Sequence, residues 1–161
     1  PDVVWRSITQ SFGSLNVMIL GSGNPYLENR LRELDEVYIN FALDLGYKEH
    51  LSHKIYASAD FLLMPSRVEP CGLNQMYAMR YGTVPVVSYT GGLRDTVQDI
   101  STGGAGLNFT NAGTDDVLHA MERATAIYGN KDLMKNLIHA NMNFDFAWEK
   151  SAQTYIDLYK N

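Results

Sequence analysis

A carboxylate, a cysteine and a glycine stand close together in the stretch MPSRVEPCGLNQMYAMRYGTVPVV, residues 64–87. Glu69 comes shortly before Cys71, the only cysteine of the chain, and a run with helical periodicity follows from about Gly72 to Tyr81. An apolar strand, a loop and a helix in this order present free backbone N–H groups to an anion. The pattern therefore predicts an anion-binding loop with a carboxylate beside it.

The residue types in this loop narrow the chemical class of the ligand that it could bind. Gly72 lets a phosphate approach the backbone, and the N–H groups of Leu73 and Asn74 could add hydrogen bonds, which suits a diphosphate. Glu69 would repel a phosphate, but a carboxylate accepts hydrogen bonds from hydroxyl groups. We therefore expect Glu69 to bind a neutral, polyhydroxylated group attached to the phosphate.

A plainer interpretation of the same residues stays open. Glu69 could be a favourable charge at the start of a helix, and Gly72 a turn glycine. Cys71 has no histidine beside it in sequence, so it is expected to pack as a small apolar residue, not to act as a nucleophile. His50 and His53 have no further cysteine or histidine at metal-binding spacing, and no metal site is expected.

Composition limits the classes of protein that the chain can belong to. Its 161 residues suit one domain, with 45% hydrophobic and 19% charged residues, both ordinary globular values. No apolar run approaches the roughly 20 residues of a membrane helix. A net charge of -5 without a basic block argues against a nucleic-acid partner. The single cysteine cannot form an internal disulfide, which favours the cytosol.

Strand-like and helical stretches alternate along the chain, which is typical of a parallel sheet with crossover helices. We expect an α/β, doubly wound, Rossmann-like fold in a single domain spanning 1–161, with a helical part from about 114 to 161. The expected strands are residues 16–23, 37–47, 60–66 and 84–89, and the expected helices between them are 24–34, 48–59, 72–81 and a short one within 90–97.

Ligands of such folds bind beyond the carboxyl ends of the strands. Four loops occupy that position in the expected fold: residues 21–23, 46–47, 66–72 and 90–92.

The sequence also resembles a known family. The stretch MPSRVEPCGLNQMYAMRYGTVPVVSYTGGLRDTV, residues 64–97, closely resembles the donor-binding segment of bacterial glycogen synthases and plant starch synthases. The likeness continues through LGSGNPYLENRLREL, GYKEHLSHKIYASADFLLMPSR and FDFAWEKSAQTYIDLYK, so it covers nearly the whole chain. In that family two Rossmann-like domains face each other in the GT-B arrangement. The chain resembles most of the carboxyl-terminal, nucleotide-sugar-binding domain.

The resemblance implies an activity and a role for each matching residue. The family transfers glucose from ADP-glucose to the non-reducing 4-hydroxyl of an α-1,4-glucan, with retention and without a metal or other cofactor. Glu69 would bind the donor sugar and support the transition state. Tyr47 would stack on the adenine, its alternative being an ordinary core tyrosine. The residues that would wrap the diphosphate and sugar are Cys71, Gly72, Leu73 and Asn74.

The chain departs from the family pattern at two positions. Tyr77 stands where the wider group of retaining transferases often has a second glutamate, and Asn74 stands where bacterial relatives often have threonine. We expect Asn74 to be tolerated because its backbone N–H makes the contact.

Two parts of the family's enzyme are expected to lie outside this chain. The basic pair that neutralises the diphosphate would lie upstream of Pro1, and the amino-terminal acceptor domain would be the chain's own partner in the full-length protein. The fragment alone is therefore expected to be inactive.

Two other functions stay open at this stage. One is a nucleotide-sugar-binding module without catalysis. The other is a related GT-B enzyme, such as a sugar-nucleotide epimerase or a transferase that uses a UDP-sugar. The preference for ADP over UDP rests on the resemblance alone, and the acidic composition favours a bacterial cytoplasm over a plastid.

Overall fold

The computed structural model describes residues 15–160, so positions 1–14 and 161 of the expected domain lie outside the described residues. The strands are β1 (Val17–Gly21), β2 (Phe41–Leu45), β3 (Phe61–Met64), β4 (Val84–Ser88) and β5 (Leu107–Phe109). The helices are α2 (Pro25–Val37), α3 (Glu49–Ser58), α4 (Asn74–Arg80), α5 (Gly91–Thr96), α6 (Thr114–Gly129), α7 (Lys131–Met142), α8 (Trp148–Lys160) and the short 3-10 helix η1 (Ile100–Thr102).

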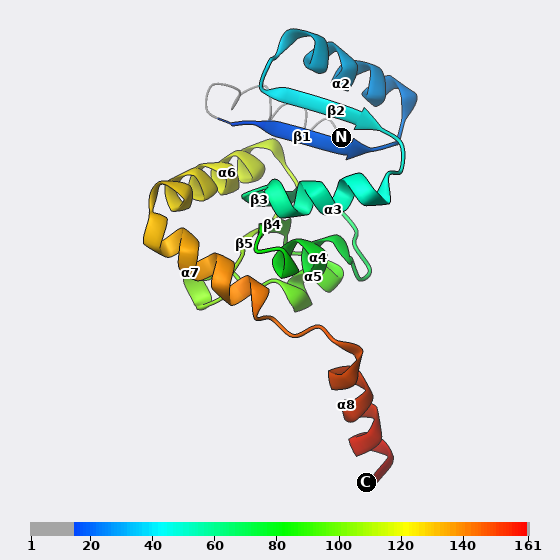
Figure 1. The fold of residues 1–161 in the computed structure, drawn as a ribbon, viewed down its shortest axis with the longest axis vertical. Coiled ribbons are helices and arrows are strands. Elements are labelled where there is room, and N and C mark those ends of the chain that lie inside the picture. Colours follow the sequence, from blue (N-terminus) through cyan, green and yellow to red (C-terminus); the bar gives the residue numbers. More distant parts are fainter. Residues whose placement is uncertain (1–14, 161) are drawn as a thin grey trace.

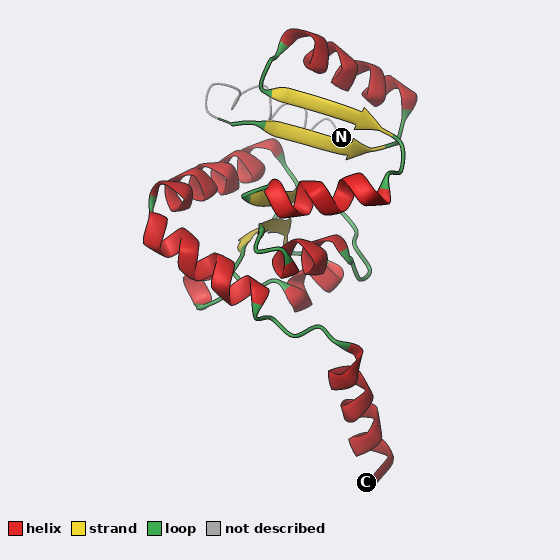
Figure 2. Cartoon of the chain, viewed as in Figure 1, coloured by secondary structure: helices red, strands yellow, loops and turns green. Residues whose placement is uncertain are grey.

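All paired strands run parallel, as expected for an α/β fold (Figures 1 and 2). Within the described part of the chain they form two sheets: β1 pairs with β2, and β3, β4 and β5 pair in that order. The expected fold class is thus confirmed, although the strands do not join into one continuous sheet.

Helix α2 is longer than the sequence indicated. The side chain of Asn24 accepts a hydrogen bond from the backbone N–H of Tyr26 at 2.9 Å, and Pro25 fills the first turn. The helix then continues through Val37, so the strand expected over 37–47 begins only at Phe41. Val37 is β-branched and β-branched residues favour strands, so the local sequence predicted a strand from this residue.

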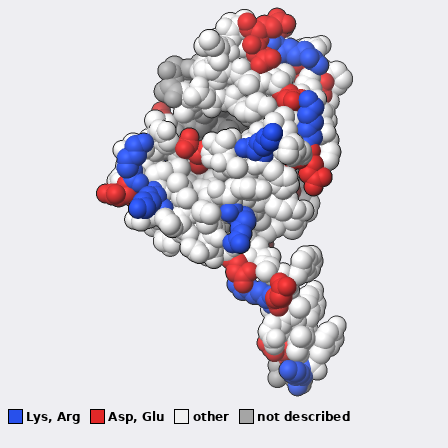
Figure 3. Space-filling model, viewed as in Figure 1, with Lys and Arg blue, Asp and Glu red and all other residues white. Residues whose placement is uncertain are grey.

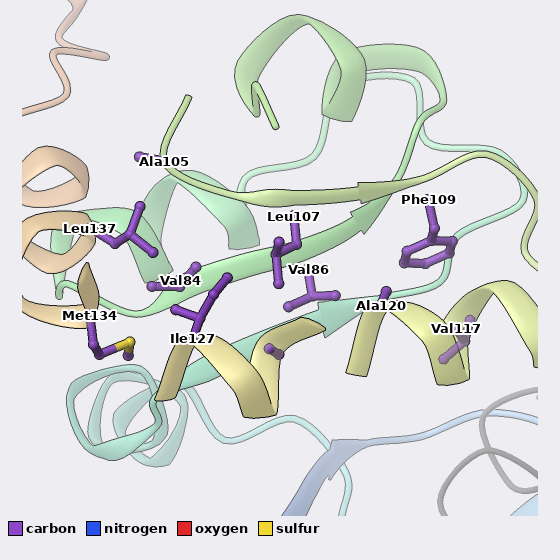
Figure 4. Packing of buried hydrophobic residues seen from close by; sticks show 11 residues of the cluster. Val84, Val86, Ala105, Leu107, Phe109, Val117, Ala120, Ile127, Met134 and Leu137 are labelled. Carbon is purple, nitrogen blue, oxygen red and sulfur yellow. The ribbon is translucent and has the colours of Figure 1, made fainter. Parts of the chain in front are cut away.

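The β3-β4-β5 sheet is covered on both faces, because side chains of a strand alternate between its faces. Val84 and Val86 of β4 pack with Leu107 of β5 and with residues of α6 and α7 (Figure 4). Val87 belongs instead to a cluster with Leu93 and other residues of the α4 and α5 side. Strand β4 is buried at all five positions, so it anchors the loops at its carboxyl end.

The helical carboxyl-terminal part is confirmed as α6, α7 and α8. The side chain of Asn130 caps α7 by accepting a hydrogen bond from the N–H of Leu133 at 3.1 Å. Helix α8 stands away from the body of the molecule at the end of an extended segment (Figure 1), and it has no buried residue.

Charged side chains of both signs are interspersed on the face shown in Figure 3. Of the helices in the described range, none has the length and apolar character that crossing a membrane requires.

Candidate functional site

The loop that follows β3 holds the candidate carboxylate. The hydroxyl of Ser66 donates a hydrogen bond to Oε2 of Glu69 at 3.3 Å, and the hydroxyl of Ser88 donates to the carbonyl of Ser66. Ser88 is the last residue of β4, so the ends of two adjacent strands fix the position of the half-buried Glu69. The carboxylate therefore lies where parallel sheets bind ligands.

The loop turns into α4 through a glycine with left-handed backbone. Gly72 has a φ of 74°, and Leu73 already has right-handed helical angles. Helix α4 begins at Asn74, two residues later than predicted, because the positive φ of Gly72 cannot continue a helix. Successive N–H groups in mixed left- and right-handed conformation form a concave site for anions.

The backbone N–H groups of this turn are available to a ligand. Within residues 15–160, those of Cys71, Gly72, Leu73 and Asn74 have no protein acceptor. The turn is on the surface, with Asn74 exposed and Leu73 53% exposed. Cys71 is exposed too, so the expectation that it packs as a small apolar residue is wrong. Since α4 has only seven residues, the N–H groups themselves, more than a helix dipole, would hold an anion.

A second predicted loop meets the first one. The N–H of Gly92, in the first turn of α5, donates to the carbonyl oxygen of Glu69 at 3.0 Å. The backbones lie so close that a Cβ on Gly91 would overlap the carbonyl oxygen of Glu69. A Cβ on Gly92 would overlap the carbonyl oxygen of Cys71. The glycine pair is therefore required for the two loops to touch.

Tyr47 follows β2 and its side chain is 87% exposed, so the alternative of a core tyrosine is wrong. It lies near an aromatic cluster of α3 and α4, in which the rings of Tyr56 and Tyr77 are 6.3 Å apart. Burial raises the pKa of the Tyr56 hydroxyl, and the neighbouring hydroxyls of Tyr77 and Tyr47 add to this effect. Tyr47 is therefore a surface residue beyond the carboxyl end of β2.

Two residues that the sequence analysis missed support the Glu69 loop. Gln75 is fully buried, and its Nε2 donates to the carbonyl of Gly72 at 2.9 Å and to the hydroxyl of Thr96 at 3.1 Å. The sequence contains one sign of this role. Gln75 precedes the buried Ala78 and Met79 by three and four residues, which puts a polar side chain on the core face of the helix.

An open hollow of about 780 Å³ lies at the ends of β4 and β5, apart from the predicted site residues. Arg123 and Asp99 are among the residues that line it, and Nη2 of Arg123 lies 2.7 Å from Oδ1 of Asp99. Burial raises the pKa of the Asp99 carboxyl. Hydrogen bonds from Arg123 and from the backbone N–H groups of Asn108 and Ser101 outweigh this and lower it from 3.8 to about 2.

No cluster of three metal-ligating side chains occurs among residues 15–160. His50 and His53 both belong to α3, where Nδ1 of His53 lies 3.1 Å from the hydroxyl of Tyr81.

Comparisons with known proteins agree with this fold. Residues 2–126 match the family described as glycosyl transferases group 1. The glycogen synthase of Flavobacterium johnsoniae is 46% identical over 160 residues, which are 99% of this chain and 34% of that protein. The glycogen synthase of Thioalkalivibrio sulfidiphilus is 45% identical over 156 residues, covering 92% of this chain and 32% of that protein.

A solved structure is similar over almost the entire chain. The catalytic domain of starch synthase IV from Arabidopsis thaliana, bound to ADP and acarbose, superposes with a TM-score of 0.87 at 33% identity. The similarity covers 99% of this chain and 35% of that one.

These findings define a parallel α/β domain of the kind found in GT-B glycosyltransferases. The chain belongs to the glycosyl transferases group 1 family, and it spans about a third of the length of the curated relatives named above.

Proposed function

We propose that this chain is the carboxyl-terminal, nucleotide-sugar-binding domain of a glycogen synthase. In the full-length enzyme it would transfer glucose from ADP-glucose to the non-reducing 4-hydroxyl of an α-1,4-glucan, with retention at the anomeric carbon. The observation that carries the proposal is the likeness, over 99% of the chain, to a starch synthase catalytic domain that binds ADP and acarbose.

The donor phosphates would lie at the turn from Cys71 to Asn74. Its N–H groups have no acceptor in the described protein, and they are the groups that a diphosphate requires. Such donors stabilise the charge that develops on the departing diphosphate. The basic pair expected in the rest of the protein would neutralise the remaining charge.

Glu69 would accept hydrogen bonds from hydroxyls of the donor glucose. In the transfer, the bond between the anomeric carbon and the phosphate oxygen breaks, and ADP leaves with that oxygen. The acceptor 4-hydroxyl forms the new bond on the same face, and its proton passes to the departing phosphate oxygen of ADP. The carboxylate of Glu69, held by Ser66, supports the positive charge that develops at the sugar ring.

Tyr47 would stack on the adenine. Its exposed ring and its position beyond the carboxyl end of β2 support this role. No metal or other cofactor is part of the proposal, because hydrogen-bond donors and basic side chains can carry the diphosphate charge.

We place the full-length enzyme in a bacterial cytoplasm. This part of the proposal is supported by the bacterial sources of the two glycogen synthases named above, which are 45–46% identical to this chain.

The test is an assay of the full-length protein with labelled ADP-glucose or UDP-glucose and glycogen. We expect label in the glucan from ADP-glucose and release of an equal amount of ADP. Transfer from UDP-glucose alone would mean that the donor is UDP-glucose and not ADP-glucose. Binding of ADP-glucose without any transfer would identify a non-catalytic module.

A further inference from the structure

The buried side chain of Gln75 contacts the turn that carries Cys71 and Gly72 on its inner side. Nε2 of Gln75 donates to the carbonyl oxygen of Gly72 at 2.9 Å and lies 3.3 Å from that of Cys71. Gln75 is 0% exposed, and its Oε1 is a buried acceptor without a hydrogen-bond partner in the described structure. This oxygen lies 2.6 Å from the position that a Cβ of Gly72 would occupy, so the amide of Gln75 packs directly against the turn.

The same amide links the turn to α5. Nε2 of Gln75 lies 3.1 Å from Oγ1 of Thr96, and this hydroxyl donates to the carbonyl oxygen of Gly92 at 2.7 Å. The N–H of Gly92 returns to the carbonyl oxygen of Glu69 at 3.0 Å. The hydrogen bonds thus form a closed circuit through the Glu69 loop, α4 and α5.

The direction of these hydrogen bonds decides where the N–H groups of the turn point. In a trans peptide the C=O and N–H groups point in opposite directions, and the described chain has no cis peptide bond. The carbonyls of Cys71 and Gly72 point inward to Gln75. The N–H groups of Gly72 and Leu73, in the same two peptide planes, therefore point outward to the exposed side.

We propose that Gln75 and Thr96 are positioning residues that fix these two peptide planes so that the N–H groups of Gly72 and Leu73 meet the β-phosphate of the donor. The inference rests on the proposed function. Neither side chain would touch the donor: Gln75 is buried, and the hydroxyl of Thr96 already bonds to Gly92. Without them, the peptide planes could rotate and the N–H groups would lose their common direction.

The experiment compares affinities for ADP and AMP, measured by calorimetry on the full-length protein. AMP lacks the β-phosphate, so a role in positioning the diphosphate site predicts that ADP loses more affinity than AMP. Thr96→Val removes the hydroxyl at nearly constant volume, and Thr96→Ser retains it. Gln75→Leu removes the amide.

A matched control is available in Thr83. It is 1% exposed, and its hydroxyl bonds to the carbonyls of Tyr56 and Ala59, away from the turn. Thr83→Val makes the same chemical change as Thr96→Val and should lower the melting temperature without changing the ratio of ADP to AMP affinity.

For Thr96→Val and Gln75→Leu we expect ADP affinity to fall about tenfold, the effect of one lost hydrogen bond, with a smaller change for AMP. Thr96→Ser should bind as the wild type does. An unchanged ratio in Thr96→Val, or an equal change in Thr83→Val, would overturn the inference even where Gln75→Leu does not fold. A wild-type protein that fails to bind ADP would refute the proposed function itself, and the inference with it.

Discussion

The backbone N–H of Gly92 donates a hydrogen bond to the carbonyl oxygen of Glu69 at 3.0 Å, so the start of α5 is bonded to the residue that carries the candidate carboxylate. Two loops that are separated in sequence thus form one structural unit. A Cβ on Gly92 would overlap the carbonyl oxygen of Cys71, so the contact depends on the absence of a side chain at Gly92.

The first prediction concerns this contact. In Gly92→Ala the new methyl group would overlap the carbonyl oxygen of Cys71, and the Glu69 loop would have to shift. Such overpacking typically costs about 1 to 3 kcal/mol. We expect a lower melting temperature and, in the full-length protein, an ADP affinity reduced by about tenfold or more. Calorimetry and thermal unfolding measure the two effects.

The control for this change is Gly129→Ala at the end of α6, where a Cβ would meet no atom within 4 Å. It should leave ADP affinity unchanged. Normal ADP binding by a folded Gly92→Ala protein would show that the loop contact does not shape the site.

A second prediction concerns Glu69. Glu69→Gln removes the negative charge but keeps a side chain of similar size that Ser66 can still contact. If the carboxylate acts mainly in the transition state, kcat should fall on the order of 10²-fold or more, while the Kd for ADP changes little. A rate near that of the wild type would leave Glu69 as a favourable charge before a helix.

A third prediction concerns Tyr47. Loss of stacking in Tyr47→Ala should weaken donor binding by roughly 1 to 3 kcal/mol, seen as a higher KM, whereas Tyr47→Phe should keep the wild-type value. Because the side chain is 87% exposed, neither change should lower the melting temperature. Equal KM values for the two variants would remove the stacking role.

A fourth prediction concerns stability and pH. The folded pKa of Asp99, about 2, is below its ordinary value of 3.8, so its stabilising effect is present above about pH 4 and is lost as the pH falls towards 2. Asp99→Asn should lower the free energy of unfolding at neutral pH by about 1.5 to 3 kcal/mol, the contribution of hydrogen bonds to a charged group.

Urea unfolding of the wild type and Asp99→Asn at several pH values measures this difference, which should shrink as the pH falls from 4 to 2. Asp95→Asn is the matched control, because the Asp95 side chain is 71% exposed and lies 3.6 Å from Arg94. A pH-independent difference would mean that the ion pair of Asp99 with Arg123 does not stabilise the fold.

Local sequence patterns predicted the strands before and after the Glu69 loop and the helices beyond residue 114. They missed β5, because Leu107–Phe109 has three residues, too few to show an alternating pattern beside the glycines that precede it. The division into two sheets was also not predictable, since strand pairing depends on contacts between distant segments.

The site was only partly predictable, because local patterns reveal some of its residues but not the contacts between distant segments. Glu69 and Gly72 carry local signs, a carboxylate before a helix and a glycine at its start. The support from Gln75 and Thr96 depends on a hydrogen bond between two helices, which no local pattern contains. The contact of Gly92 with Glu69 likewise joins two loops that the sequence presented as separate candidates.

The last prediction concerns the 161-residue chain by itself. A retaining transfer needs donor, acceptor and charge stabilisation in one desolvated cleft, and this chain spans about a third of its curated relatives. Without the expected basic pair, the donor diphosphate would meet backbone N–H groups on a protein of net charge -5. Donor binding should therefore be weak, with a Kd of about a millimolar or more.

The check is to incubate the purified chain with labelled ADP-glucose and glycogen, and to follow ADP release and label in the glucan. Circular dichroism and a cooperative thermal transition would show that the chain is folded, as expected for a domain with its own core. We expect no transfer above a blank without protein, because no second domain holds the acceptor and water remains at the site. Label in the glucan would mean that residues of this chain alone position the acceptor, contrary to the proposed division between two domains.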